Sequence, residues 1–148
     1  MADVIVLTTD FSEEAARAYG PTLDLAKRLG AKVEFVHVVP DLVAIPYGSL
    51  LAPPQHEPDL AAKVKAAKQE LDKVTSSLDS DVEVSTAVLT GEYPEKVLAD
   101  HAQEVGAKWI AMASHGRSGL RRIVLGSFAE AVLRHSTTPI AIYPPPEH

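Results

Sequence analysis

Short apolar runs alternate with amphipathic segments along this chain. Residues 4–7 (VIVL) and 109–113 (WIAMA) are apolar throughout, which is typical of central parallel strands covered on both faces. Residues 32–39 and 82–89 alternate more strongly between apolar and polar side chains, and a last short run covers residues 139–143. The pattern predicts five strands, of which 32–39 and 82–89 lie nearer an edge of the sheet.

Helical patterns separate these strands. Between residues 60 and 78, apolar side chains recur at steps of three and four while lysines fall on the opposite face, which predicts an amphipathic helix. A first helix is predicted from about residue 12 to Leu29. Because Gly20 and Pro21 fall inside this helix, we expect a kink or a short break there. Two further helices are predicted over residues 94–106 and 127–137.

Strands that alternate with helices in this way predict an α/β domain. We expect a doubly wound, five-stranded parallel sheet with helices on both faces, Rossmann-like, with the strand order 3-2-1-4-5. The chain shows no internal repeat, so residues 1–148 are interpreted as a single domain. The stretch 40–58 carries five prolines and is too long for an ordinary connection. Both a plain surface loop and a lid or interface role stay open for it.

Composition narrows the class of protein further. The chain has 148 residues, 46% of them apolar, which is enough for one packed core. It has no cysteine, so neither a disulfide framework nor a thiolate metal site is expected. No apolar run is long enough to cross a bilayer, no leader pattern precedes the first strand, and the net charge is −6. We therefore expect a cytoplasmic protein that binds neither membranes nor nucleic acid.

The candidate chemistry lies at the carboxyl ends of the predicted strands. In a doubly wound sheet, ligands bind beyond these ends, where the strand order reverses. Three segments should meet there, namely residues 8–10, residues 38–39 and the loop 113–127. This loop combines glycines, arginines and hydroxyl side chains: Gly116, Gly119, Gly126, Arg117, Arg121, Arg122, Ser114, Ser118 and Ser127.

The loop 113–127 has the features of a phosphate site. Glycines let backbone amides approach a ligand closely, and arginines and hydroxyls donate hydrogen bonds to anions. Gly126 and Ser127 open a helix, whose free N–H groups and positive dipole end also favour an anion. The alternative is a solvated turn in which Ser127 is an ordinary helix cap. Asp10 or Ser12 would cap the first helix, and for Asp10 both this role and a ligand contact stay open.

Three segments of the chain resemble the universal stress protein family. They are TTDFSEEA, FVHVV and MASHGRSGLRRIVLGSFAEAVLRHSTTPIAI, and the resemblance covers nearly the whole chain. Nucleotide-binding members of that family have Gly, two residues, Gly, nine residues, then Gly followed by Ser or Thr. Here the same spacing joins Ala113, Gly116, Gly126 and Ser127, with alanine in place of the first glycine. Thr8 stands where the family often has proline, and Phe128 where many nucleotide-binding members have a small or polar residue.

The resemblance implies a ligand and its contacts. Asp10 and the backbone of Val38 would hold the adenosine part of a nucleotide, while residues 113–119 and 127–129 would hold ribose and phosphates. The ligand would be ATP or another adenine nucleotide such as AMP, ADP or cyclic AMP, and Mg²⁺ could bind together with its phosphates. The site so implied comprises Thr8, Thr9, Asp10, Val38, Ala113, Ser114, His115, Gly116, Arg117, Ser118, Gly119, Gly126, Ser127, Phe128 and Ala129.

Catalytic residues are not apparent in the sequence. There is no Gly-x-x-x-x-Gly-Lys-Ser/Thr motif, no carboxylate pair for acid–base work, and no acid to complete a triad with Ser114 and His115. His37 is expected to be a hydrogen-bonded core residue, and His115 to make either a loop-stabilising bond or a ligand contact. Three functions stay open: an ATP-binding signalling module in stress response, a slow Mg²⁺-dependent ATP hydrolase, and a nucleotide-free interaction protein.

The last strand bears on all three functions. The segment PIAIY would leave an apolar strand edge exposed unless it is paired. Pairing across a two-fold axis would cover it, and homodimers are common in the resembling family. We expect a homodimer that forms through the C-terminal strand.

Overall fold

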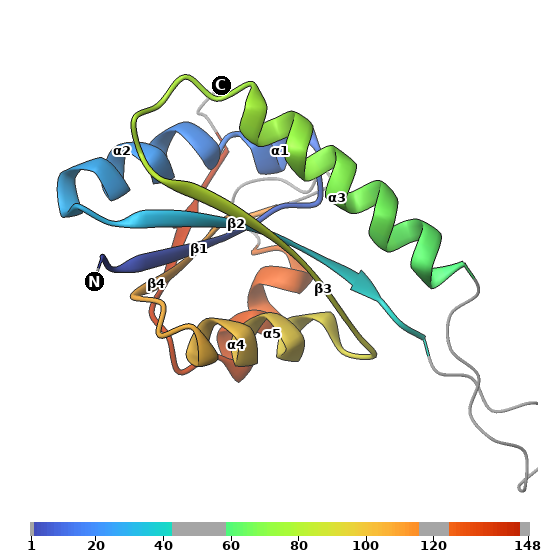
Figure 1. Cartoon of the computed structure of the whole chain (residues 1–148). Helices are drawn as coiled ribbons and strands as arrows, with labels where there is room; N and C mark the ends of the chain where they lie inside the picture. The colour runs from blue at the N-terminus through green and yellow to red at the C-terminus, as the bar shows by residue number, and fades with distance from the viewer. Residues whose placement is uncertain (1, 43–58, 116–124, 146–148) are drawn as a thin grey trace, which may run out of the picture.

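One parallel sheet of five strands organises the molecule. The computed structural model describes residues 2–42, 59–115 and 125–145. The strands lie in the order β3-β2-β1-β4-β5, and every neighbouring pair is parallel (Figure 1). Their bounds are β1 Val4–Thr8, β2 Lys32–Pro40, β3 Val84–Gly91, β4 Trp109–Ala113 and β5 Ile140–Tyr143. The predicted doubly wound sheet and its strand order are confirmed.

Helices cover both faces of the sheet, as predicted. Figure 1 shows α1, α2 and α3 on one face and α4 and α5 on the other. Ile5, Leu7 and Phe35 point to the first face, while Val6 and Val36 point to the second, so each face has its own buried core. The helices span α1 Glu13–Ala16, α2 Tyr19–Leu29, α3 Leu60–Ser76, α4 Pro94–Glu104 and α5 Ser127–His135.

The break in the first predicted helix lies about one turn earlier than expected. Helix α1 ends at Ala16 and α2 begins at Tyr19, so Gly20 and Pro21 lie in the first turn of α2 rather than at the break. A proline ring collides with the carbonyl of the residue four positions before it, which here is Arg17. The helix therefore breaks at Arg17, while Pro21 itself is tolerated in a first turn, where its missing N–H costs nothing.

The two edge strands differ from the central ones in burial. Every residue of β1 from Ile5 to Thr8 is buried, whereas all four residues of β5 are partly exposed. Strand β3 forms the other edge and has no buried residue, and β2 lies directly beside it. Residues 82–89 form the edge strand β3, as predicted. Residues 32–39 form β2, which is second from its edge just as β4 (109–113) is, so the predicted contrast between these two strands is wrong.

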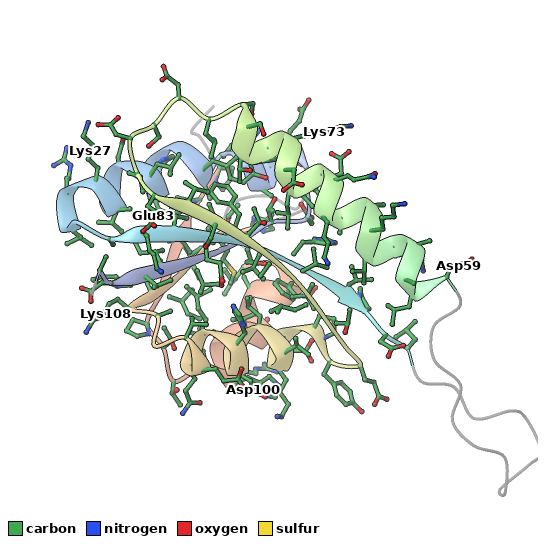
Figure 2. All side chains as sticks on the ribbon, viewed as in Figure 1. Lys27, Asp59, Lys73, Glu83, Asp100 and Lys108 are labelled. Atoms are coloured by element: carbon green, nitrogen blue, oxygen red, sulfur yellow. The ribbon has the colours of Figure 1, made fainter. Side chains whose placement is uncertain are left out.

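Charged side chains occupy the outer faces of the helices. Lys27, Lys73 and Asp100 extend from the helices away from the sheet (Figure 2). One pair is largely covered instead: His101 Nε2 on α4 lies 2.5 Å from Glu34 Oε1 on β2, and the two side chains are only 16% and 18% exposed. Within the described ranges, no helix combines the length and apolar character that a membrane span requires.

Candidate functional site

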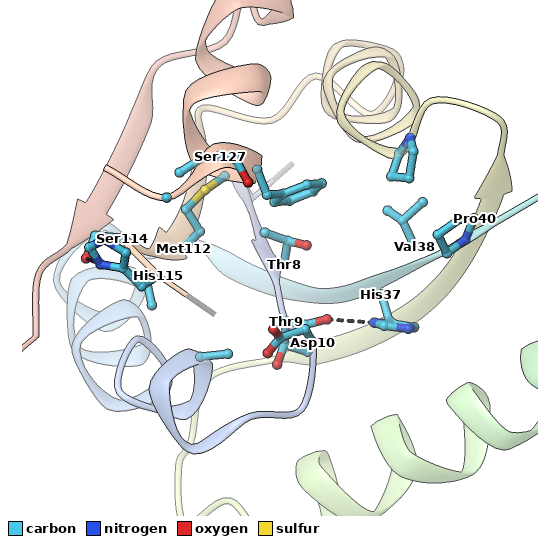
Figure 3. A pocket seen from close by; sticks show the side chains of 16 residues that line it. Thr8, Thr9, Asp10, His37, Val38, Pro40, Met112, Ser114, His115 and Ser127 are labelled. Carbon is cyan, nitrogen blue, oxygen red and sulfur yellow. Dashed lines mark hydrogen bonds between the residues drawn. The ribbon is translucent and has the colours of Figure 1, made fainter. Parts of the chain in front are cut away.

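A cavity of about 350 Å³ opens at the carboxyl edge of the sheet, which is a volume within the usual range of small-molecule sites. It lies where the strand order reverses, because β1 pairs with β2 on one side and with β4 on the other. Figure 3 shows it between the turn after β1, the end of β2 and the start of α5. The predicted site residues that line it are Thr8, Thr9, Asp10, Val38, Ala113, Ser114, His115, Gly126, Ser127, Phe128 and Ala129.

Four predicted site residues lie outside the described part of the chain. They are Gly116, Arg117, Ser118 and Gly119, and Arg121 and Arg122 lie outside it as well. The proline-rich stretch from 43 to 58 is outside it too.

The cavity also has lining residues that sequence reasoning missed, namely Ala15, His37, Pro40, Pro94 and Met112. His37, Pro40 and Met112 lie at or near the ends of predicted strands, so the rule that placed Val38 at this edge could have included them. Pro94 begins α4 directly after β3, at the same edge of the sheet.

Asp10 lies in the turn that joins β1 to α1. Its Oδ1 accepts hydrogen bonds from the amide of Ser12 at 3.0 Å and from the hydroxyl of Ser12 at 2.5 Å. Ser12 Oγ in turn accepts from the amide of Ala15 at 3.1 Å, so Ser12 is the N-cap of α1. The sequence leaves open whether Asp10 or Ser12 caps this helix, and Ser12 is the cap. Asp10 instead supports the cap from two positions before it, and it lines the cavity as well.

Tyr19 packs against the same turn from α2. Its hydroxyl lies 2.5 Å from Thr9 Oγ1, which also accepts from the amide of Phe11 at 3.0 Å. Burial raises the pKa of the Tyr19 phenol above its ordinary value of 10.0, and the charge of Asp10 raises this pKa further. The hydrogen bond with Thr9 lowers the same pKa.

The end of β4 and the start of α5 form the cavity wall opposite Asp10. The amide of Gly126 donates to the carbonyl oxygen of Ser114 at 2.9 Å. Gly126 is the N-cap of α5, so the alternative in which Ser127 caps the helix is wrong, and Ser127 is the first helical residue. Within the described ranges, no side chain caps this helix. Its first turn therefore presents amides and a positive dipole end at the cavity wall, an arrangement that favours an anion.

Ala113 and His115 complete this wall. Ala113 ends β4 and is not among the residues with positive φ, so alanine fits where the family pattern has glycine. His115 is only 5% exposed, and its Nδ1 lies 3.0 Å from the hydroxyl of Ser114. This contact matches the expected loop-stabilising bond. Nε2 of the same ring is buried without a hydrogen-bond partner in the described structure.

The described residues form no cluster of side chains that could hold a metal ion. No group of three or more histidine, cysteine, aspartate or glutamate side chains gathers there in a way that could hold a metal ion. Among the cavity-lining residues in the described ranges, Asp10 is the single carboxylate. Hydroxyl and apolar side chains make up most of the remaining lining.

The fold and the cavity define a doubly wound α/β protein with a ligand site at its topological switch point. The model of the universal stress protein family matches residues 1–144. The chain belongs to the universal stress protein family, which confirms the resemblance seen in the sequence. It is 28% identical to the universal stress protein MJ0531 of Methanocaldococcus jannaschii over 144 residues, which cover 97% of this chain and 82% of that protein.

Two solved structures share the fold. One is a universal stress protein in complex with cAMP, at 20% identity and a TM-score of 0.57, with 95% of each chain covered. The other is a universal stress protein from Archaeoglobus fulgidus in complex with dAMP. It matches at 19% identity and a TM-score of 0.62, with 96% of this chain and 97% of that chain covered.

Proposed function

We propose that this protein binds ATP or another adenine nucleotide in the switch-point cavity and acts as a nucleotide-dependent signalling module in stress response. The observation that carries the proposal is the composition of the two cavity walls. One wall offers the carboxylate of Asp10, and the other offers the N-terminus of α5, which no side chain of the described residues caps. A nucleoside phosphate needs both, because its base carries N–H donors and its phosphates are anionic.

Each of the two walls contacts a different part of the nucleotide. The adenosine part lies toward Asp10 and Val38, where Pro40 and Pro94 supply apolar surface. The ribose and phosphates lie toward Ser114 and the first turn of α5. The complexes of two relatives with cAMP and dAMP support an adenine nucleotide as the ligand class.

Binding is preferred to hydrolysis as the function. A hydrolase needs a group that activates water. The single carboxylate that lines the described cavity already accepts two hydrogen bonds from Ser12, and each of the cavity's two described histidines, His37 and His115, already has a hydrogen-bond partner at Nδ1. Mg²⁺, if it takes part, would arrive with the phosphates. Phosphate release from ATP with and without Mg²⁺ tests this preference, and steady turnover that depends on Mg²⁺ would replace it with hydrolysis. A cytoplasmic location and the lack of nucleic-acid binding stay predictions.

Small molecules released from the purified, denatured protein provide the first test. Mass spectrometry should detect an adenine nucleotide, and calorimetric titration of the emptied protein should give saturable binding of ATP. A ligand at a hundred times its Kd stabilises the folded state by about 2.7 kcal/mol, which shifts the melting temperature by several degrees. GTP is the matched control. The absence of any shift with ATP, ADP, AMP and cyclic AMP would refute the proposed function.

Pairing of two copies through β5 is the second part of the proposal. The carbonyls of Pro139 and Tyr143 accept hydrogen bonds from the amides of Ile110 in β4 and of Ser114 directly after it. The backbone groups of Ile140 and Ile142 therefore face outward at the edge. A dimer would cover this edge. Light scattering at micromolar protein should give twice the chain mass, and Ile142→Pro, which removes one outward N–H, should give a folded monomer. A monomeric parent protein would contradict the pairing.

A further inference from the structure

We propose that His37 is a positioning residue that holds Asp10 at its place in the cavity wall. The inference rests on the proposed function, because Asp10 is the carboxylate that the proposal assigns to the adenosine part. His37 comes from β2, but its ring reaches the turn that follows β1, where Figure 3 shows it joined to Thr9. Its Nδ1 lies 2.7 Å from the carbonyl oxygen of Thr9.

The direction of this hydrogen bond follows from its acceptor. A carbonyl oxygen can only accept, so Nδ1 of His37 must carry the proton that it donates to Thr9. The peptide that contains this carbonyl leads directly into Asp10. The orientation of that peptide sets the direction in which the Asp10 side chain leaves the backbone.

The next residue in the turn is held in an unfavourable backbone conformation. Phe11 has a φ of +67°, which is uncommon for a residue with a bulky side chain. Its ring packs on the ring of His37, with the two centroids 4.6 Å apart and the planes tilted by 39°. Such a backbone conformation persists only where the surrounding structure imposes it, and residues in such conformations are frequent at ligand sites. His37 therefore contacts the turn on both sides of Asp10, through the carbonyl of Thr9 and the ring of Phe11.

The turn is anchored from its other side as well. Thr9 Oγ1 bonds to the amide of Phe11 and to the hydroxyl of Tyr19, and the amide of Thr9 donates to the carbonyl of Val36 at 2.9 Å. These contacts fix Thr9, while His37 fixes the peptide between Thr9 and Asp10. One carboxylate oxygen of Asp10 accepts hydrogen bonds from both the amide and the hydroxyl of Ser12. The carboxylate is thus set in place before a ligand arrives, which lowers the cost of binding.

Two substitutions separate the hydrogen bond of His37 from its ring contact. His37→Asn keeps a side-chain N–H near the position of Nδ1 and loses the ring, whereas His37→Phe keeps a ring against Phe11 and loses the donor. Calorimetric titration with ATP should show a loss of affinity of about three- to tenfold in His37→Phe. His37→Asn should stay within about twofold of the parent protein. Tripolyphosphate, which lacks the adenosine part, should bind all three proteins equally.

A double-mutant cycle tests whether His37 acts through Asp10. If it does, adding His37→Phe to Asp10→Ala should weaken ATP binding no further than Asp10→Ala alone. Melting temperatures of all variants establish that each one is folded. Additive losses in the cycle, or equal losses in His37→Phe and His37→Asn, would overturn the inference.

A measurement without ligand keeps this inference distinct from the proposed function. The amide of Ser12 donates to Asp10, so its hydrogen exchange followed by NMR reports the position of the carboxylate. Exchange at Ser12 should accelerate in His37→Phe and not in His37→Asn. If the parent protein binds no adenine nucleotide, the proposed function fails while this pattern still supports the positioning role. Unchanged exchange at Ser12 in His37→Phe would overturn the positioning role even if ATP binds.

Discussion

The amide of Gly126 donates a 2.9 Å hydrogen bond to the carbonyl oxygen of Ser114, and this contact ties the first turn of α5 to the end of β4. A Cβ atom at Gly126 would lie 2.7 Å from that same carbonyl oxygen. Gly126 has a φ of −60°, which any residue can adopt, so glycine is required here for the close approach and not for its backbone conformation. The wall of the cavity that faces Asp10 depends on this approach.

Gly126→Ala should therefore lower both stability and nucleotide affinity. The added methyl group must push Ser114 away, and overpacking of this kind costs about 1–3 kcal/mol. Urea denaturation measures the free energy of unfolding, and calorimetry with ATP measures the affinity. Gly20→Ala is the matched control, because a Cβ at Gly20 meets no atom within 4 Å and alanine favours the helix. Equal stability of the Gly126→Ala protein and its parent would contradict the close packing.

Sequence pattern alone predicts most of this fold. The apolar runs and helical periods locate all five strands and four helical regions, because each period follows directly from which face of an element is buried. The break before α2 was placed about one turn too late, since the local signal at Gly20 and Pro21 does not reveal that the steric conflict falls on Arg17.

The sequence likewise predicts part of the candidate site and misses another part. Asp10, Val38 and Ser127 were predicted because they follow strand ends or open a helix, and the rule for switch points brings such segments together. His37 was interpreted as a core residue, and its role in the cavity wall was missed. Its contacts with Thr9 and Phe11 depend on the turn after β1 and on the positive φ of Phe11, which no periodicity records.

Gly91 at the end of β3 gives a second test of close packing. A Cβ built at Gly91 would overlap the Cγ2 atom of Val97 on α4. Gly91→Ala should destabilise the protein by about 1–3 kcal/mol, and Val97→Ala in the same chain should recover part of this loss by removing the obstructing methyl group. Urea denaturation of the two single variants and the double variant measures the coupling. Purely additive free energies would show that the overlap is relieved in another way.

The pair formed by Glu34 and His101 should contribute more to stability than the exposed ion pairs do. Its side chains are only 16% and 18% exposed, and the two partners join β2 to α4. Glu34→Ala leaves the largely buried His101 without its hydrogen-bond partner, which should cost about 1–3 kcal/mol in the free energy of unfolding. Asp100→Ala is the control, because it removes an exposed pair with Lys96 on the same helix and should cost less than about 1 kcal/mol. Similar losses in both variants would show that burial adds nothing to the pair.

Tyr19 should make the stability of the protein depend on pH in the alkaline range. Its pKa is raised above 10.0 by burial, so the folded state holds the phenol proton more tightly than the unfolded chain does. The resulting stabilisation is fully present below the unfolded pKa of 10.0, and it is lost as the pH rises through the higher folded value. Tyr19→Phe has no phenol to ionise and lacks the hydrogen bond to Thr9. The variant should be about 1 kcal/mol less stable than the parent protein at neutral pH. This difference in stability should shrink as the pH rises above the pKa of the phenol in the unfolded chain.

Absorbance of tyrosinate measures the same shift directly. In an alkaline titration of the folded protein, the Tyr19→Phe variant should lose a phenol that ionises above pH 10.0. Tyr93→Phe is the control, because Tyr93 is 57% exposed and its removal should leave that late-ionising phenol in place. If Tyr19→Phe instead removes a phenol that ionises at or below pH 10.0, then burial does not raise the pKa of Tyr19.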